Sequence, residues 1–125
     1  MNFKQLLISS IIMLTLDSVY LTTFSNYFNK VVKNIQGEKI KFNIIGAILC
    51  YFLLIYGINY FIIDEKKTLI ESFILGIVIY GVFETTNYAI FKNWTLGAVG
   101  LDTLWGGILF VLTTYLTRIT YRLIS

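Results

Sequence analysis

Three carboxylate side chains lie inside long apolar stretches of this sequence: Asp17, Glu84 and Asp102. An ionised carboxylate at the centre of a bilayer costs at least about 2.5 kcal/mol on insertion scales, so an acid at that depth calls for a pairing or functional explanation. Because no Lys or Arg lies within the same stretches, protons, hydroxyl and amide donors, water or a bound cation must satisfy these acids. We expect at least one of them to be protonated at neutral pH, since neighbouring like charges oppose each other's ionisation.

Each acid has a polar or aromatic neighbour at helical spacing. Residues three apart share one face of a helix, and this spacing pairs each acid with a tyrosine, an asparagine or a tryptophan. The pairs are Asp17 with Tyr20, Glu84 with Asn87 and Asp102 with Trp105, and Thr86 adds a hydroxyl group near Glu84. These seven residues are the predicted ligand- or ion-binding set.

Other kinds of chemistry have little support in the composition. The chain has no histidine and a single cysteine, Cys50, which excludes an internal disulfide and argues against zinc, haem or iron–sulfur ligation. Paired carboxylates can act as general acid and base, but no nucleophile, metal-binding triad or phosphate-binding loop accompanies them. We therefore expect no cofactor, no metal ion and no enzyme activity.

The elements that must position these acids are four apolar stretches. Of 125 residues, 57% are hydrophobic and 14% are charged, and the mean hydropathy of +0.75 is far from that of a soluble protein. About 20 apolar residues suffice to cross a bilayer as a helix. The predicted spans are residues 5–24, 42–63, 69–91 and 96–116. This predicts an all-α integral membrane protein, one domain over residues 1–125, folded as an up-down bundle of four transmembrane helices with both termini on the same side.

An up-down path places all three acids in the same half of the bilayer. With a rise of 1.5 Å per residue, each acid lies on the side of the membrane that carries Trp94 and the long connection between the first two spans. At matching depth Ala47 and Cys50 are small enough for close packing or for a cavity, and Gly106 and Gly107 permit close helix contact. The acids are therefore expected to form one polar cluster.

Between the first two spans, residues 25–36 alternate apolar and polar side chains at helical spacing and predict an interfacial amphipathic segment. The net charge of +3 comes from basic residues that flank the spans, so we read them as headgroup anchors and expect no nucleic acid partner. They number five on each side of the membrane and leave the orientation open.

A longer motif runs through the third and fourth stretches. It reads Tyr80-Gly81-x-x-Glu84-x-Thr86-Asn87, continues with Trp94 and ends with Asp102-x-x-Trp105-Gly106. Together with Asp17-Ser18-Val19-Tyr20-Leu21, it resembles the small bacterial predicted membrane proteins catalogued as domain of unknown function twenty-one seventy-seven, over nearly the whole chain. The resemblance implies a four-helix membrane fold and brings no established activity. The motif positions that it implies are Asp17, Glu84, Asn87, Trp94, Asp102, Trp105 and Gly106.

Two hypotheses for the function remain open. The first is a proton- or cation-coupled transport or ion-binding subunit. The second is a non-catalytic structural or assembly protein whose buried acids hold helices together, as a component of a membrane complex or of an internal virion membrane. Both predict a lipid bilayer as surroundings and either a homo-oligomer or other membrane or structural proteins as partners. The expected location is a bacterial inner membrane, or an internal virion membrane if the gene is viral.

Overall fold

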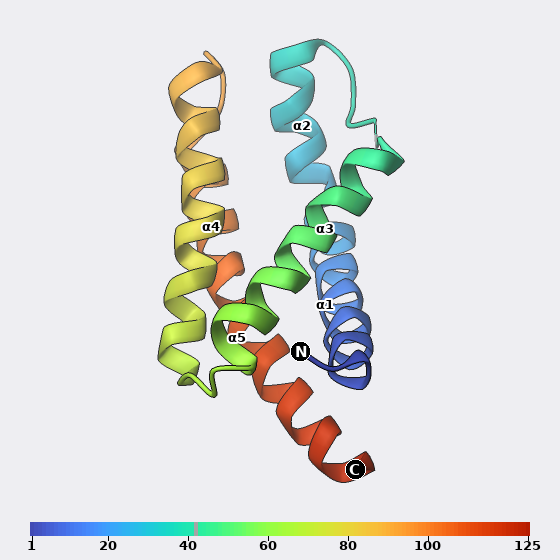
Figure 1. Cartoon of the computed structure of the whole chain (residues 1–125). Coiled ribbons are helices and arrows are strands. Elements are labelled where there is room, and N and C mark those ends of the chain that lie inside the picture. The colour runs from blue at the N-terminus through green and yellow to red at the C-terminus, as the bar shows by residue number, and fades with distance from the viewer. Residues whose placement is uncertain (42) are drawn as a thin grey trace.

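The computed structural model describes residues 1–41 and 43–125, and its regular elements are helices (Figure 1). In chain order they are α1 (Phe3–Thr23), α2 (Ser25–Gln36), α3 (Ile44–Ile58), the π-helical η1 (Asn59–Ile63), α4 (Leu69–Ile90) and α5 (Leu96–Ile124). Four stretches are long and apolar enough to cross a membrane: Phe3–Thr23, Ile44–Ile63, Leu69–Ile90 and Leu96–Ile124. The prediction of an all-α protein with four membrane spans is confirmed.

The observed helix ends differ from the predicted spans at a few places. The predicted first residue of the second span, Phe42, lies outside the described residues, and α3 begins at Ile44. The last helix continues to Ile124, although we predicted that the span ends at Leu116. No glycine or proline follows Leu116, so nothing in the sequence interrupts the backbone hydrogen bonds there.

Each span starts at a polar residue that caps the helix. The side chains of Asn2, Asn43, Thr68 and Thr95 each accept a hydrogen bond from a backbone N–H three residues ahead, at 2.7–3.1 Å. The Glu71 side chain also accepts from the Thr68 backbone N–H, which completes a capping box. These caps satisfy amides that have no partner inside the helix.

The tightest helix pair is α4 against α5, and it depends on glycine. A Cβ atom at Gly76 would collide with the Gly106 carbonyl oxygen, one at Gly106 with the Tyr80 ring, and one at Gly107 with the Phe73 ring. The expected close contact at Gly106 and Gly107 is confirmed. Against this pair α1 packs along α5, and an apolar core forms from Met13, Leu54, Ile58, Ile62, Ile63, Leu109 and Phe110.

The second span crosses the bundle obliquely and is α-helical only in its first part (Figure 1). In η1 the buried Asn59 Nδ2 donates to the Ile55 carbonyl at 2.8 Å and to Ser9 Oγ at 2.9 Å. Gln5 Nε2 donates to Asn59 Oδ1 at 2.9 Å. The π-helical segment is therefore the polar anchor of the second span on α1, while the beginning of α3 leans away from α4.

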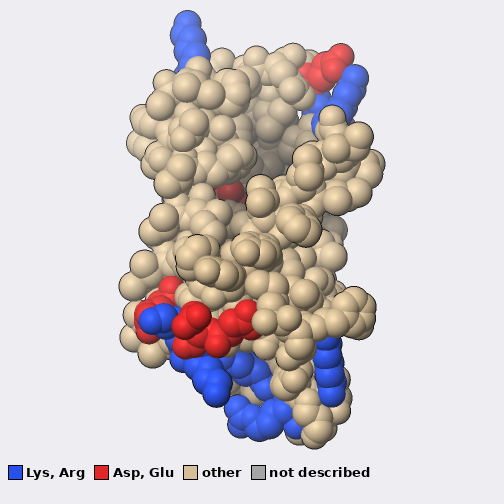
Figure 2. Space-filling view, in the orientation of Figure 1, with Lys and Arg blue, Asp and Glu red and all other residues tan. Residues whose placement is uncertain are grey.

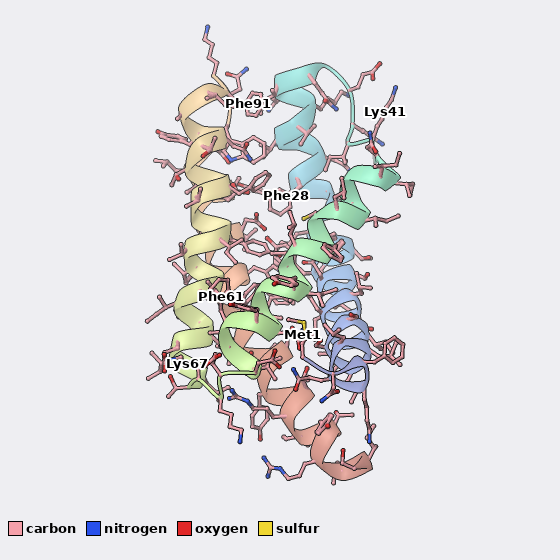
Figure 3. The ribbon with its side chains drawn as sticks, viewed as in Figure 1. Met1, Phe28, Lys41, Phe61, Lys67 and Phe91 are labelled. Carbon is pink, nitrogen blue, oxygen red and sulfur yellow. The ribbon has the colours of Figure 1, made fainter. Side chains whose placement is uncertain are left out.

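Helix α2 continues beyond α1 and packs against the connection between α4 and α5. Tyr27 Oη lies 3.0 Å from Thr95 Oγ1, and Asn93 Nδ2 donates to the Asn34 carbonyl at 3.0 Å. Phe28, which is buried, points from α2 toward the interior of the bundle (Figure 3). The interfacial position of this segment stays a prediction. Both termini lie at the opposite end of the bundle, where Asn2 Nδ2 donates to Tyr121 Oη at 3.1 Å (Figure 1).

Candidate functional site

Asp17 on α1 receives hydrogen bonds from two other helices. Trp105 Nε1 on α5 donates to Asp17 Oδ1 at 2.9 Å, and Tyr51 Oη on α3 donates to Asp17 Oδ2. The carboxylate is only 6% exposed. One acid therefore connects α1, α3 and α5 through an indole and a phenol.

The two helices α1 and α5 run in opposite directions, and their acid–aromatic pairs interlock. Asp17 accepts from Trp105 on α5, whereas Tyr20 Oη on α1 donates to Asp102 Oδ1 at 3.1 Å. The rings of Tyr20 and Trp105 stack with centroids 4.6 Å apart and planes within 2°. The spacing of three residues places acid and aromatic on one face of each helix, and the antiparallel packing lets each helix supply the donor for the other helix's acid.

Glu84 on α4 is the third acid, and it lines the same cavity as Asp102. Its side chain is almost completely buried, at 1% exposure. Trp94 Nε1 donates to Glu84 Oε1 at 2.8 Å. The geometry therefore defines a pair of neighbouring carboxyl groups, Glu84 and Asp102, that is joined to Asp17 through Tyr20 and Trp105.

Not every predicted site residue belongs to this cluster. The structure brings together Asp17, Tyr20, Glu84, Asp102 and Trp105. Asn87 is buried, but within the described part of the chain its side chain makes no hydrogen bond to an acid. Thr86 is exposed, because two residues after Glu84 the helix has turned by roughly 200° and points the side chain away from the bundle. A place for Thr86 beside the acids was therefore wrongly predicted.

Two donors to the cluster were absent from the predicted set. Tyr51 lies thirteen residues before Asp64, and Asp17 lies thirteen after Lys4, so counting from the charged ends of the two spans would have placed them at equal depth. The helix face of Tyr51 depends on η1, which the sequence did not reveal. Trp94 was expected at the membrane surface, but the turn before α5 folds its indole back onto Glu84.

Two cavities border the acids. One of about 390 Å³ is lined by Asp17, Asp102, Tyr51 and Tyr80 among others, and also by Cys50. A second, of about 320 Å³, is lined by Glu84, Asp102, Trp94 and Phe28 among others. Asp102 thus lies between the two cavities.

The hollow that holds these cavities opens on one face of the molecule. Figure 2 shows acidic atoms at the floor of a recess in the upper half of that face. Lys41 lines both cavities and stands at the end of the bundle beside α3, where it pairs with Glu38 at 3.0 Å (Figure 3). The acids are therefore buried side chains that face open space inside the fold.

The family model described as "Predicted membrane protein (DUF2177)" matches residues 2–119. The chain belongs to this family. The resemblance inferred from the Glu84 and Asp102 motifs is confirmed, and the protein is an integral membrane protein with four candidate spans. No curated protein and no solved structure matches the chain.

The motif residues of this DUF2177 protein supply donors and acceptors for protons. Indole and phenol groups donate to the acids, and the acids accept; among residues 1–41 and 43–125 no group of three His, Cys, Asp or Glu side chains is placed to hold a metal ion. Such an arrangement can hold a proton or a monovalent cation and can also fix four helices to one another. The exposed apolar side chains of the same helices, such as Ile48, Phe52, Val78 and Leu104, face the lipid.

Proposed function

We propose that this protein is an ion-binding membrane subunit that takes up and releases a proton or a cation at the Glu84–Asp102 carboxyl pair, in proton- or cation-coupled transport. The observation that carries the proposal is the position of Asp102, which lines one cavity with Glu84 and a second cavity with Asp17. An acid used only as glue between helices is expected in a fully packed environment, whereas an exchanging site needs space for water or an ion. Four spans are few for an independent transporter, so we infer that it works in a small homo- or hetero-oligomer.

Flux across a reconstituted membrane tests the proposal. In proteoliposomes with an internal pH-sensitive dye, Glu84→Gln and Asp102→Asn should abolish a proton- or cation-dependent flux, because amides keep the shape and the hydrogen bonds but cannot exchange a proton. The matched control is Glu65→Gln, the same chemical change in the exposed turn before α4. A flux that is indifferent to both cluster variants would exclude the transport role.

The natural cysteine reports whether water reaches the acids. Cys50 lines the same cavity as Asp17 and Asp102 and is otherwise exposed on the outside of the second span. In a bilayer that outer side meets lipid, so a small charged thiol reagent must reach Cys50 through water in the cavity. We expect a cationic methanethiosulfonate to label Cys50 faster than an anionic one, because the neighbouring acids attract positive charge. The double variant Asp17→Asn with Asp102→Asn should reduce this difference in labelling rate. No labelling by either reagent in the folded protein would show that the cavity is closed to water.

A structural or assembly role is the second candidate, and one observation favours it. Each of the three acids accepts from a Trp or Tyr donor on another segment of the chain. Under this reading the amide variants should be nearly silent, whereas Asp17→Ala and Asp102→Ala should reduce folding or assembly because alanine removes every acceptor. Comparing amide with alanine variants therefore separates the two candidates.

A further inference from the structure

A separate cavity of about 620 Å³ lies at the end of the bundle that holds both termini. Its wall combines the turn after η1 with the last turns of α5, and Gln5 and Tyr121 contribute polar groups. Three cationic side chains line it: Lys66, Arg118 and Arg122. We call this cavity the basic end pocket; basic atoms gather at the same end of the molecule in Figure 2.

The cations of the basic end pocket have no acidic partner within the described residues. Of the acids near this end, Asp64 lies 3.3 Å from the Met1 amino group and Glu71 on α4 lies 3.9 Å from Lys67 Nζ, while Glu65 is exposed and does not line the cavity. Ser125 also lines the cavity, and the three cations would leave the lining with a positive net charge even if one negative charge lay beside them. The pocket therefore offers uncompensated positive charge to an anion.

Arg118 is held in a fixed position by the backbone. Its Nη2 donates to the Lys67 carbonyl at 2.7 Å and to the Ile62 carbonyl at 3.4 Å. A guanidinium carries five N–H donors in a rigid plane, so donors on the other nitrogens remain for a ligand. The planar fork matches the geometry of a phosphate group.

Two further features single out this pocket. Lys66 has a φ of 52°, the one non-glycine residue of the described chain with a left-handed backbone, and such strain tends to persist at ligand clamps. Thr117 lines the cavity, and its Oγ1 is completely buried and has no hydrogen-bond partner among the described residues. A buried hydroxyl without a partner calls for a ligand or water beside it.

The pocket lies at the depth of lipid headgroups. At 1.5 Å per residue the 29-residue α5 is roughly 43 Å long and exceeds a hydrocarbon core of about 30 Å. Its last turns, which carry Arg118 and Arg122, therefore extend past the hydrocarbon on the side of the turn at residues 64–67. An anion that enters here meets the cations from the headgroup layer, and Ile63 offers an apolar wall for the glycerol and upper acyl chain.

We propose that the basic end pocket binds the phosphate of an anionic phospholipid. Lipid phosphate and free phosphate share the chemistry that the three cations recognise, but only the lipid also occupies the apolar wall and is delivered at this depth. The site is separate from the carboxyl cluster and does not depend on the transport proposal.

Native mass spectrometry of the full chain, titrated in detergent with phosphatidylglycerol or phosphatidylcholine of identical acyl chains, tests the site. We expect phosphatidylglycerol to bind roughly tenfold more tightly, and Lys66→Asn with Arg122→Gln to remove this preference, because each cation near the surface is worth a fewfold in affinity for an anionic lipid. Asparagine tolerates the left-handed backbone at position 66. The matched control is Lys30→Gln with Lys33→Gln, which removes the same charge from the exposed face of α2.

Three results would overturn the proposal. In the first, phosphatidylglycerol and phosphatidylcholine bind with equal affinity. In the second, the Lys30→Gln, Lys33→Gln control loses as much affinity for phosphatidylglycerol as the pocket variant does. In the third, millimolar inorganic phosphate displaces phosphatidylglycerol and binds to the protein as tightly as the lipid does. The last would assign the pocket to a soluble phosphate. Arg122→Lys keeps the charge and should retain most of the lipid preference, and a thermal melt of each variant establishes that loss of binding is not loss of fold.

Discussion

Removing the hydroxyl group of Tyr51 should weaken the attachment of α3 to the rest of the bundle. Tyr51→Phe deletes the donor to Asp17 and leaves the ring in place. A hydrogen bond to a charged group is worth about 1.5–3 kcal/mol in soluble proteins, but interhelical bonds measured in a membrane protein average about 0.6 kcal/mol. Asp17 keeps its bond from Trp105, and it borders a cavity that has room for water. We therefore expect the free energy of unfolding to fall by about 1 kcal/mol.

The assay is reversible unfolding in mixed micelles of a mild detergent and SDS. Tyr56→Phe is the matched control, because Tyr56 lies on the same helix, is 47% exposed and donates no hydrogen bond within the described chain. A double-mutant cycle with Asp17→Asn isolates the pair and should give a coupling close to the single effect. Equal losses for Tyr51→Phe and Tyr56→Phe, or strictly additive effects in the cycle, would refute the assignment of Tyr51 as the donor that anchors α3.

Two further matched pairs test the packing of α5. Gly106→Ala should lower the unfolding free energy by about 1–3 kcal/mol through overpacking against Tyr80, whereas Gly57→Ala, where a Cβ meets nothing within 4 Å, should be neutral or slightly stabilising in the same unfolding assay. Thr113→Val removes a buried hydroxyl that has no hydrogen-bond partner among the described residues, so it should not lower the unfolding free energy. Thr114→Val breaks the 2.8 Å hydrogen bond with Ser72 Oγ and should lower the unfolding free energy by about 1 kcal/mol. A reversed order within either pair would contradict the corresponding packing.

The sequence was sufficient for the four spans and for the grouping of the acids. Apolar length and polar caps define helices that must cross a bilayer, and the up-down path then fixes the depth of Asp17, Glu84 and Asp102. Spacing by three also identified Tyr20 and Trp105 as neighbours of the acids. It did not reveal that each aromatic donates to the acid of the other helix, because that exchange depends on the antiparallel contact of α1 and α5.

Contacts set by loops and by helix rotation could not be predicted in the same way. Thr86 was included on the strength of its hydroxyl, although its angle around α4 separates it from Glu84. Trp94 reaches Glu84 because a short turn folds the indole back, and no periodicity describes a turn. The basic end pocket also unites residues from α1, the turn at 64–67 and α5, which are distant in sequence and meet only in the folded chain.

The π-helical segment has a consequence for how this gene can vary. A π-helical turn closes hydrogen bonds over five residues where an α-helix uses four, so η1 is equivalent to one residue inserted into the second span. One residue corresponds to about 100° of rotation around the helix axis. Deleting the codon for the exposed Tyr60 would restore a regular α-helix between Asn59 and the turn and would swing Tyr51 from Asp17 toward the lipid. A single codon therefore decides which face of the second span meets the acid, although the deletion would remove no residue of the cluster itself.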